Sequence, residues 1–165
     1  MAGDSWEVRR LGPEETDAAV DLAWETFLEF EAPDYGAEGT QTFWRDVAGN
    51  EGFRERCKRG EVRVWGAHDG TVLAGMMAVR GEGHICLAFT RGEYMRRGVG
   101  SAIFRKIVEE IRLENPGVSQ MTVNSSPYGA PFYRGMGFAE EGGERTSGGM
   151  RYIPMTYLMA HDERH

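Results

Sequence analysis

The most regular pattern of apolar and polar positions in the chain lies between residues 99 and 114. Apolar residues recur there every four positions, with two more beside them, and charged residues occupy the other faces. The apolar residues are Val99, Ile103, Phe104, Ile107, Val108 and Ile111. This spacing predicts one buried stripe on an α-helix. Because the apolar run at residues 84–90 is typical of a strand, the segment predicts a strand, a glycine-containing loop and a helix.

The first sixty residues predict one strand followed by three helices. Residues 6–11 form a short strand that ends at Gly12, and Pro13 with two acids after it favours a helix start. Pro33 is expected to end this helix, and shorter helical patterns follow at residues 41–47 and near residue 53. The buried side of the first helix is expected to carry Val20, Ala23, Trp24, Phe27, Leu28 and Phe30.

Three consecutive strands are predicted between residues 61 and 90. The apolar runs at residues 61–68 and 71–80 are joined by an Asp-Gly dipeptide, which is a strong hairpin signal. The glycines around residue 82 make a second turn into the strand at residues 84–90. The three strands therefore form an antiparallel meander that leads into the glycine-containing loop.

The last third of the chain predicts a strand at residues 118–124, a short helix, and two strands at residues 138–141 and 150–159. A helix connects the strand at residues 118–124 to the preceding one, and such a crossover favours parallel pairing. Residues 142–149 are glycine-rich and are expected to be a loop. Pro154 is expected to make the last strand an edge strand or a bulged one.

Taken in order, these elements predict an α/β protein with a three-layer arrangement. The sheet is expected to be mixed, with helices on both faces, and no boundary divides the chain. A length of 165 residues suits one domain. We therefore expect a single domain over residues 1–165, with residues 1–5 and 160–165 as flexible ends.

The composition narrows the range of functions. A formal net charge of −7 argues against nucleic-acid binding. No apolar run approaches the roughly 18 residues of a membrane span, and no signal region precedes the first strand, so a cytoplasmic protein is expected. Cys57 and Cys86 are too few for a disulfide framework and lack metal-ligand spacing, so no metal is expected.

Positive charge is concentrated at the loop before the long helix. Residues 91–106 contain five basic residues and one acid, although the whole chain is acidic. A helix start offers free backbone N–H groups and partial positive charge, and glycines allow an anion to approach closely. An anion site is one interpretation, and a solvated arginine-rich turn is the other. The chain lacks the P-loop sequence, and Ile103 stands where the dinucleotide fingerprint needs a small residue.

Two motifs, in this order, resemble those of the GNAT superfamily of N-acetyltransferases. Gly98 and Gly100 match its coenzyme A pyrophosphate loop, Q/R-x-x-G-x-G/A, although Met95 departs from the leading position. The second motif is a strand that ends near an asparagine, then a helix with an alanine and F-Y-x-x-x-G-F. It is filled by Asn124, Ala130, Phe132, Tyr133, Gly137 and Phe138. The short signatures NSSPY, RYIPM and APDY resemble one bacterial branch.

The resemblance covers the chain from about residue 6 to 159 and implies a GNAT-like fold, with a mostly antiparallel sheet whose central parallel pair splays apart. It implies acetyl-CoA as the cosubstrate, bound mostly through backbone amides. The residues expected to bind it are Phe89, Thr90, Arg96, Arg97, Gly98, Val99, Gly100, Ser101, Asn124 and Phe132. An alternative for Asn124 is to cap the following helix.

The implied reaction is attack of an amine on an acetyl thioester through a tetrahedral oxyanion. Tyr133 is the candidate general acid, because a phenol with a pKa of about 10 can donate to a thiolate of pKa near 8.5. The alternative is that Tyr133 only packs in the core. His84, Glu82 and a water relay are the candidate bases. Strand alternation places Glu82, His84, Cys86, Ala88 and Thr90 on one face, if Gly83 does not bulge.

Acidic residues between 25 and 38 are expected to lie near the acceptor. Glu29, Glu31 and Tyr35 are the expected acceptor contacts, and a solvated face is the alternative. The expected enzyme is an N-acetyltransferase that acts on the primary amine of a small, cationic acceptor. A non-catalytic acyl-CoA-binding module and acetylation of a protein lysine or N-terminus are the alternatives. No nucleic-acid or membrane partner is expected, and homodimerisation is left open.

Overall fold

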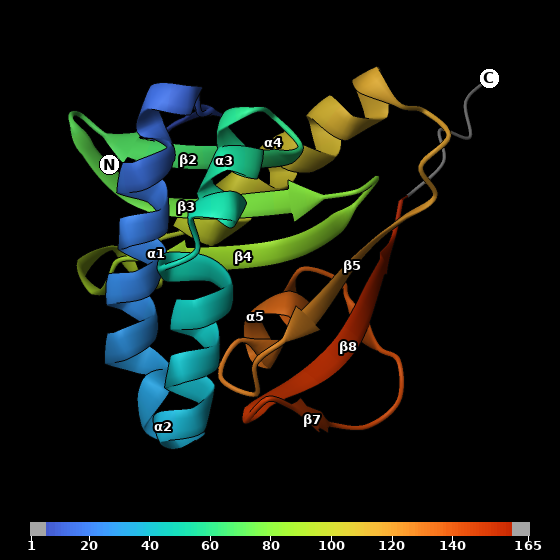
Figure 1. Cartoon of the computed structure of the whole chain (residues 1–165). Coiled ribbons are helices and arrows are strands. Elements are labelled where there is room, and N and C mark those ends of the chain that lie inside the picture. Colours follow the sequence, from blue (N-terminus) through green and yellow to red (C-terminus); the bar gives the residue numbers. More distant parts are fainter. Residues whose placement is uncertain (1–5, 160–165) are drawn as a thin grey trace.

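A twisted β-sheet lies between helices in residues 6–159, the part of the chain that the computed structural model describes (Figure 1). The expected flexible ends lie outside these residues. The helices are α1 (Thr16–Phe30), α2 (Ala32–Phe43), α3 (Glu51–Lys58), α4 (Val99–Glu114) and α5 (Ala130–Gly135). The strands are β1 (Glu7–Arg10), β2 (Val62–Asp69), β3 (Val72–Arg80), β4 (His84–Thr90), β5 (Gln120–Ser125), β6 (Ala139–Glu140), β7 (Arg145–Ser147) and β8 (Met150–Leu158).

The strands of the sheet follow the order β1-β2-β3-β4-β5-β8-β6, and β7 pairs with β8. Among the described strands only β4 and β5 run parallel, and all other pairs are antiparallel. The meander β2-β3-β4 and the crossover through α4 are as predicted. The expected fold, a mixed and mostly antiparallel sheet with a central parallel pair, is confirmed.

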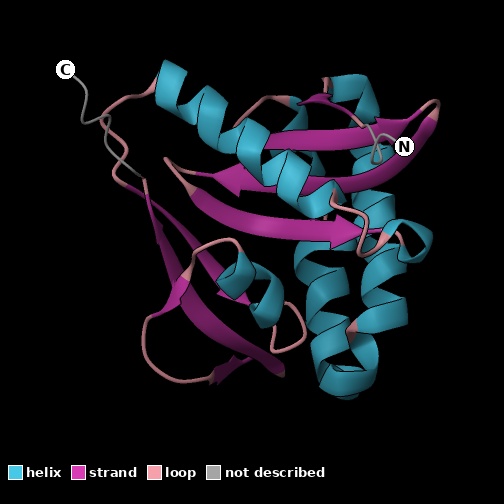
Figure 2. Cartoon of the chain, turned by 180° about the vertical axis from the view of Figure 1, so that it is seen from behind, coloured by secondary structure: helices cyan, strands magenta, loops and turns pink. Residues whose placement is uncertain are grey.

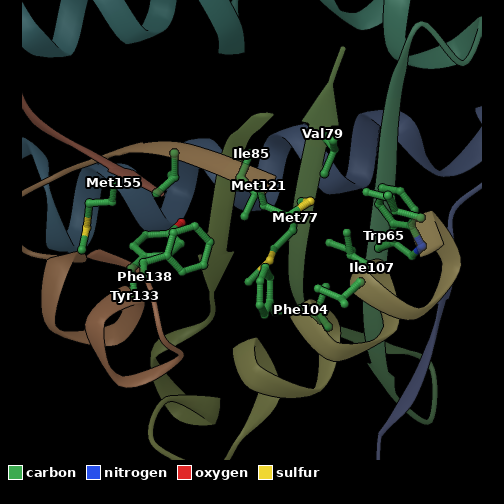
Figure 3. Packing of buried hydrophobic residues seen from close by; sticks show 14 of the residues in the cluster. Trp65, Met77, Val79, Ile85, Phe104, Ile107, Met121, Tyr133, Phe138 and Met155 are labelled. Carbon is green, nitrogen blue, oxygen red and sulfur yellow. The ribbon is translucent and has the colours of Figure 1, made fainter. Parts of the chain in front are cut away.

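Helices cover both faces of the sheet. Figure 1 shows α1, α2 and α3 on one face, and Figure 2, from behind, shows α4 across the other. The apolar stripe predicted for α4 is buried throughout, from Val99 to Ile111. Figure 3 shows the core on this side, which runs from Trp65 and Ile107 to Tyr133 and Phe138. A second core cluster fills the space between the sheet and α1.

Two details of the N-terminal helices differ from the prediction. Leu28 is 43% exposed, because the buried stripe of α1 passes through Val20, Ala23 and Phe27 and leaves Leu28 at its edge. Pro33 ends α1 as expected, but it also begins α2, since a proline fits the first helical turn where its missing N–H is not needed. A positive φ of 73° at Gly36 kinks α2.

Two details of the C-terminal region also differ. The expected glycine loop contains β7, because Gly148 and Gly149 both adopt positive φ (58° and 77°) and turn the chain into a hairpin with β8. The last strand is not an edge strand, since β8 lies between β5 and β6. The Pro154 carbonyl accepts from Glu141 N–H at 2.8 Å, so its ring nitrogen faces the gap between β6 and β7, where no donor is needed.

Candidate active site

A wedge-shaped opening lies at the centre of the sheet, where β4 and β5 separate. Their parallel pairing includes only His84 with Thr122 and Ile85 with Val123, after which the strands diverge (Figure 1). A cavity of about 1130 Å³ occupies the opening and is lined by the later residues of both strands. The splayed parallel pair that the resemblance implied is therefore present.

A bulge at Cys86 is the local cause of this divergence. Ala78 of β3 pairs with Leu87, but the next residue, Val79, pairs with Ile85, so Cys86 has no partner opposite it. An extra residue bends its strand. Ile85 packs on the α4 side, whereas Cys86 and Leu87 both pack on the α1 side. Ile85 and Cys86 therefore still alternate, and the predicted alternation breaks between Cys86 and Leu87, inside the strand. Ala88 packs on the α4 side and does not share a face with Cys86, so this part of the prediction is wrong.

The start of α4 forms one wall of the cavity. Gly98 adopts a φ of 86° and caps the helix, and the first backbone bond inside the helix runs from Ala102 N–H to the Gly98 carbonyl at 3.0 Å. The N–H groups of Val99, Gly100 and Ser101 have no partner in the described part of the chain, and these residues line the cavity. Such a helix start can bind an anion.

The two arginines before this helix have different environments. Arg96 lines the cavity and has a φ of 62°, the only positive φ of a non-glycine residue between residues 6 and 159. The guanidinium of Arg97 lies over the rings of Trp6 and Tyr94, with its carbon 5.2 and 5.1 Å from their centroids. Arg97 does not line the cavity.

The other expected cosubstrate contacts lie around the same cavity. The ring of Phe132 covers the start of α4, since a Cβ on Gly100 would lie 2.7 Å from its Cζ. Phe89 turns toward α2 and packs edge-on against Phe43, with centroids 5.8 Å apart. Thr90 lines the cavity at the end of β4, and Asn124 is exposed at the end of β5.

Tyr133 of α5 is buried beside the wedge. Its ring packs edge-on against Phe132 and Phe138, each with a centroid 5.2 Å away. The only fully buried, unpartnered side-chain polar atom in the described chain is Nδ1 of His68, so the unbonded Tyr133 hydroxyl retains an opening to the cavity. Burial raises the pKa of Tyr133, and Glu31 and Cys86 raise it further. The phenol therefore remains protonated.

Glu31 connects α1 to α2 and lines the cavity. It is the only acidic residue that lines the cavity in the described part of the chain. Burial raises the pKa of its carboxyl to about 7, the Ser126 hydroxyl lowers it by hydrogen bonding, and Asp34 raises it. Near neutral pH this carboxyl can both accept and release a proton.

A small polar cluster surrounds the Glu31 carboxyl. Ser126 Oγ accepts a hydrogen bond from Gly129 N–H at 2.9 Å, which leaves its own hydrogen free for Glu31. The Tyr35 hydroxyl donates to the carbonyl of Arg151 at 3.1 Å, and burial raises its pKa. The contribution of Ser126 to the Glu31 carboxyl was not predicted from the sequence.

The two residues expected to act as bases lie elsewhere. Glu82 and His84 line a separate hollow of about 470 Å³ that shares no lining residue with the main cavity. Nδ1 of His84 lies 2.8 Å from Thr122 Oγ1, and burial lowers the pKa of this imidazole. His84 begins β4 and Thr90 ends it, so roughly 20 Å of strand separates this hollow from the glycine loop.

The acidic region expected around the acceptor does not converge on the cavity. Glu29 is exposed and does not line the cavity, and Glu25 forms an ion pair with Arg91 at 3.2 Å. Only Glu31 and Tyr35 of the expected acceptor contacts line it. Two helical residues that are two positions apart point in nearly opposite directions, which explains why Glu29 and Glu31 differ.

No helix between residues 6 and 159 is long and apolar enough to cross a membrane. Within the same residues, no three histidine, cysteine, aspartate or glutamate side chains come together in a group that could hold a metal ion.

Solved structures share this fold at low sequence identity. A GCN5-related N-acetyltransferase from Rhodopseudomonas palustris is 19% identical, with a TM-score of 0.79 over 96% of this chain and 98% of that one. The PaiA N-acetyltransferase from Thermoplasma acidophilum, in complex with coenzyme A, is 18% identical, with a TM-score of 0.75 over 94% and 99%. An aminoglycoside 6'-N-acetyltransferase, also complexed with coenzyme A, is 13% identical, with a TM-score of 0.66 over 94% and 98%.

Sequence comparison gives the family. No relative was found among curated protein sequences. The family model of the acetyltransferase (GNAT) domain matches residues 31–159, which include the wedge, the start of α4 and Tyr133. The chain therefore belongs to the GNAT family of acetyltransferases.

Proposed function

We propose that this protein transfers the acetyl group of acetyl-CoA to the primary amine of a small molecule, and that residues 1–165 act as one acetyltransferase domain. The observation that carries the proposal is the cavity between β4 and β5, which the start of α4, Tyr133 and Glu31 all line. Two structures of the same fold contain coenzyme A, which supports the choice of cosubstrate.

The start of α4 is the proposed site for the pyrophosphate of acetyl-CoA. The N–H groups of Val99, Gly100 and Ser101 supply donors, and Gly98 leaves the approach open because nothing lies near its missing Cβ. Arg96 adds positive charge at the same wall. The pantetheine arm then enters the wedge, where the bulged part of β4 offers backbone groups that the neighbouring strand does not pair.

Tyr133 is the proposed donor to the sulfur as the C–S bond breaks. A phenol starts about 1.5 pKa units above a thiol, and burial raises the pKa of Tyr133 further, so complete proton transfer costs at least about 2 kcal/mol. Donation of a hydrogen bond in the transition state avoids that cost. Tyr133 therefore stabilises the developing thiolate, and its proton need not leave before the bond breaks.

Glu31 is the proposed base, in place of His84 and Glu82. An alkyl ammonium has a pKa of about 10.4, so its proton is lost more easily to a carboxyl of pKa about 7 than to an ordinary one of 4.5. The gain of 2.5 units corresponds to about 3 kcal/mol, or more than a hundredfold in the population of free amine.

Bonds, protons and charge balance in the proposed reaction. Glu31 takes one proton from the ammonium, and the free amine attacks the thioester carbonyl carbon. The tetrahedral oxyanion collapses, the C–S bond breaks, and the thiolate receives the hydrogen bond of Tyr133. The nitrogen loses its second proton as the amide forms, and the sulfur gains one. The products are the N-acetylated amine, coenzyme A and one proton released to solvent.

The experiment is an assay of thiol release with purified protein, acetyl-CoA and a panel of small amines. We expect amine-dependent release of coenzyme A, and mass spectrometry should detect the acetylated amine. Tight acetyl-CoA binding without turnover of any amine would instead indicate the non-catalytic acyl-CoA-binding module. Acetylation of peptides but of no small amine would indicate a protein acceptor.

A further inference from the structure

The walls of the cavity carry few charges. Three charged residues line it in the described chain, and these are Glu31, Arg96 and Arg151. Arg96 lies at the loop before α4, where the pyrophosphate is proposed to bind. The guanidinium of Arg151 is held by Glu144 at 2.6 and 3.2 Å. Glu31 is therefore the one negative group that the wall offers to an acceptor.

The cavity wall next to the polar cluster of Glu31 is aromatic and apolar. The acceptor end of the cavity, as we call it, is lined by Phe27, Glu31, Tyr35, Phe43, Met150 and Tyr152. Phe27 stacks on Phe43 with centroids 4.3 Å apart and planes 3° apart, and on Tyr35 with centroids 5.7 Å apart. Phe27 is fully buried and Phe43 is 6% exposed, so these two rings hold the wall in place from behind. Tyr35, Met150 and Tyr152 are half-buried and form the accessible part of this rigid apolar surface.

This end is also tied together by contacts between distant parts of the chain. Thr42 Oγ1 of α2 donates to the Gly148 carbonyl at 2.6 Å, in the turn between β7 and β8. Gly39 approaches the same turn so closely that a Cβ there would lie 2.8 Å from the Gly149 carbonyl oxygen. The aromatic wall from α1 and α2 and the residues of β8 thus form one fixed chamber, with Tyr35 bonded across it to Arg151.

We infer that the acceptor is a primary amine with a single positive charge and an apolar body. Its ammonium group binds at Glu31 and its apolar body lies against the aromatic wall. This inference rests on the proposed acetyl transfer and specifies its substrate class.

The lining disfavours acceptors with further charges. A second ammonium group would lose its hydration against aromatic rings, and no second carboxylate lines the cavity in the described part of the chain. The neighbouring Asp34 is exposed and lies outside this lining. A carboxylate beside the amine would face Glu31, while Arg151 is already paired with Glu144. The class of small cationic acceptors expected from the sequence therefore becomes smaller. Polyamines and aminoglycosides carry further ammonium groups, and free amino acids carry a carboxylate, so all three are disfavoured.

The experiment compares matched acceptors by kcat/KM in the thiol-release assay. Hexylamine and hexamethylenediamine have the same chain and differ in the second ammonium group, and phenethylamine and phenylalanine differ in the carboxylate. We expect the singly charged amine of each pair to be better by about tenfold or more, and hexylamine to exceed ethylamine by about tenfold or more, because each buried methylene contributes. Equal or better values for hexamethylenediamine, phenylalanine or ethylamine would overturn the inference.

A pair of variants tests the same point from the side of the protein. Met150→Glu adds a second carboxylate to the acceptor end, and Met150→Gln has nearly the same shape without the charge. We expect Met150→Glu to lower the ratio of kcat/KM for hexylamine over hexamethylenediamine by about tenfold relative to Met150→Gln. The ratio compares two substrates of one variant, so a loss of folded protein does not affect it. An equal ratio in the two variants would contradict the inference.

The two levels of failure are distinguishable. If a polyamine or an amino acid is the best acceptor, acetyl transfer stands and only the substrate class is wrong. If no amine is acetylated although acetyl-CoA binds, the proposed function fails and the inference fails with it.

Discussion

Replacing Glu31 by glutamine should stabilise the fold above neutral pH while it removes the proposed base. Burial holds the pKa of this carboxyl at about 7 in the folded protein, compared with 4.5 for the ordinary group. The folded state therefore binds this proton more tightly than the unfolded state does. Stability falls as the pH rises from 4.5 to 7, because ionisation becomes favourable first in the unfolded chain.

The size of the effect follows from the difference in pKa. Each pKa unit corresponds to 1.36 kcal/mol, so a raise of 2.5 units predicts a penalty of about 3 kcal/mol above pH 7 and almost none below pH 4.5. Glutamine does not ionise and avoids the penalty. For a domain of this length, about 3 kcal/mol corresponds to an increase in Tm of about 6 to 12 °C.

The assay is urea unfolding of wild type and Glu31→Gln at several values between pH 4 and 8, with the difference in unfolding free energy plotted against pH. The difference isolates Glu31, because other groups contribute equally to both proteins. Tyr133 and Cys86, whose pKa values are also raised by burial, titrate above this range. Glu29→Gln, at an exposed residue that does not line the cavity, is the matched control and should not stabilise the fold above neutral pH.

A difference that does not change with pH would refute the reasoning. A variant less stable than wild type at pH 8 would refute it too, since it would mean that the ionised carboxyl is well paired in the folded protein. The same variant should lose most of its acetyl transfer, which would make Glu31 a residue kept for function in spite of its cost in stability.

Three further predictions concern other parts of the chain. Tyr133→Phe should lower kcat by about 10²–10⁴-fold and change the Kd for acetyl-CoA far less, as stopped-flow kinetics and calorimetry can show; an unaltered kcat would leave Tyr133 as a packing residue. Ser101→Glu should weaken acetyl-CoA binding by about tenfold or more without lowering Tm, because an acid in the first helical turn stabilises the helix but repels a phosphate. An unchanged calorimetric affinity would mean that the pyrophosphate does not bind at the start of α4. Glu15→Gln should destabilise the fold by about 1–3 kcal/mol at pH 7, because Arg9 holds the pKa of Glu15 at about 2. This loss of unfolding free energy should vanish as the pH falls through 2, and an equal loss at every pH would contradict the ion-pair argument.

Local patterns were enough to predict most of the architecture. The stripe of α4, the meander β2-β3-β4 and the helix start at Gly98 were predicted correctly because each depends on periodicity or turn chemistry within a few residues. The position of Tyr133 along the chain was also enough to predict that it lies close to the wedge. A parallel crossover places the ends of β4 and β5 at the same edge of the sheet.

Tertiary structure decided which acidic and basic side chains reach the cavity. A local pattern could not show that β4 bulges at Cys86, because the bulge depends on the pairing of β3 with β4. His84 was a good candidate for a base by its chemistry, yet its place at the first residue of β4 puts it at the far end of the strand from the loop. The side-chain chemistry of His84 suggested a base, and its position in the sheet places it outside the main cavity.

Glu31 shows the same division most clearly. The sequence by itself determined that an acidic segment joins the first helix to the second. This segment follows the first strand and precedes the other strands of the sheet. Only the packing of α1 against β3 and β4, and of α2 against β8, turned Glu31 inward and left Glu29 in solvent. Burial and the hydroxyl of Ser126, which is 95 residues later in the chain, then set its pKa. Desolvation by distant segments is a property of the assembled fold, and it made an ordinary surface residue type into a candidate base.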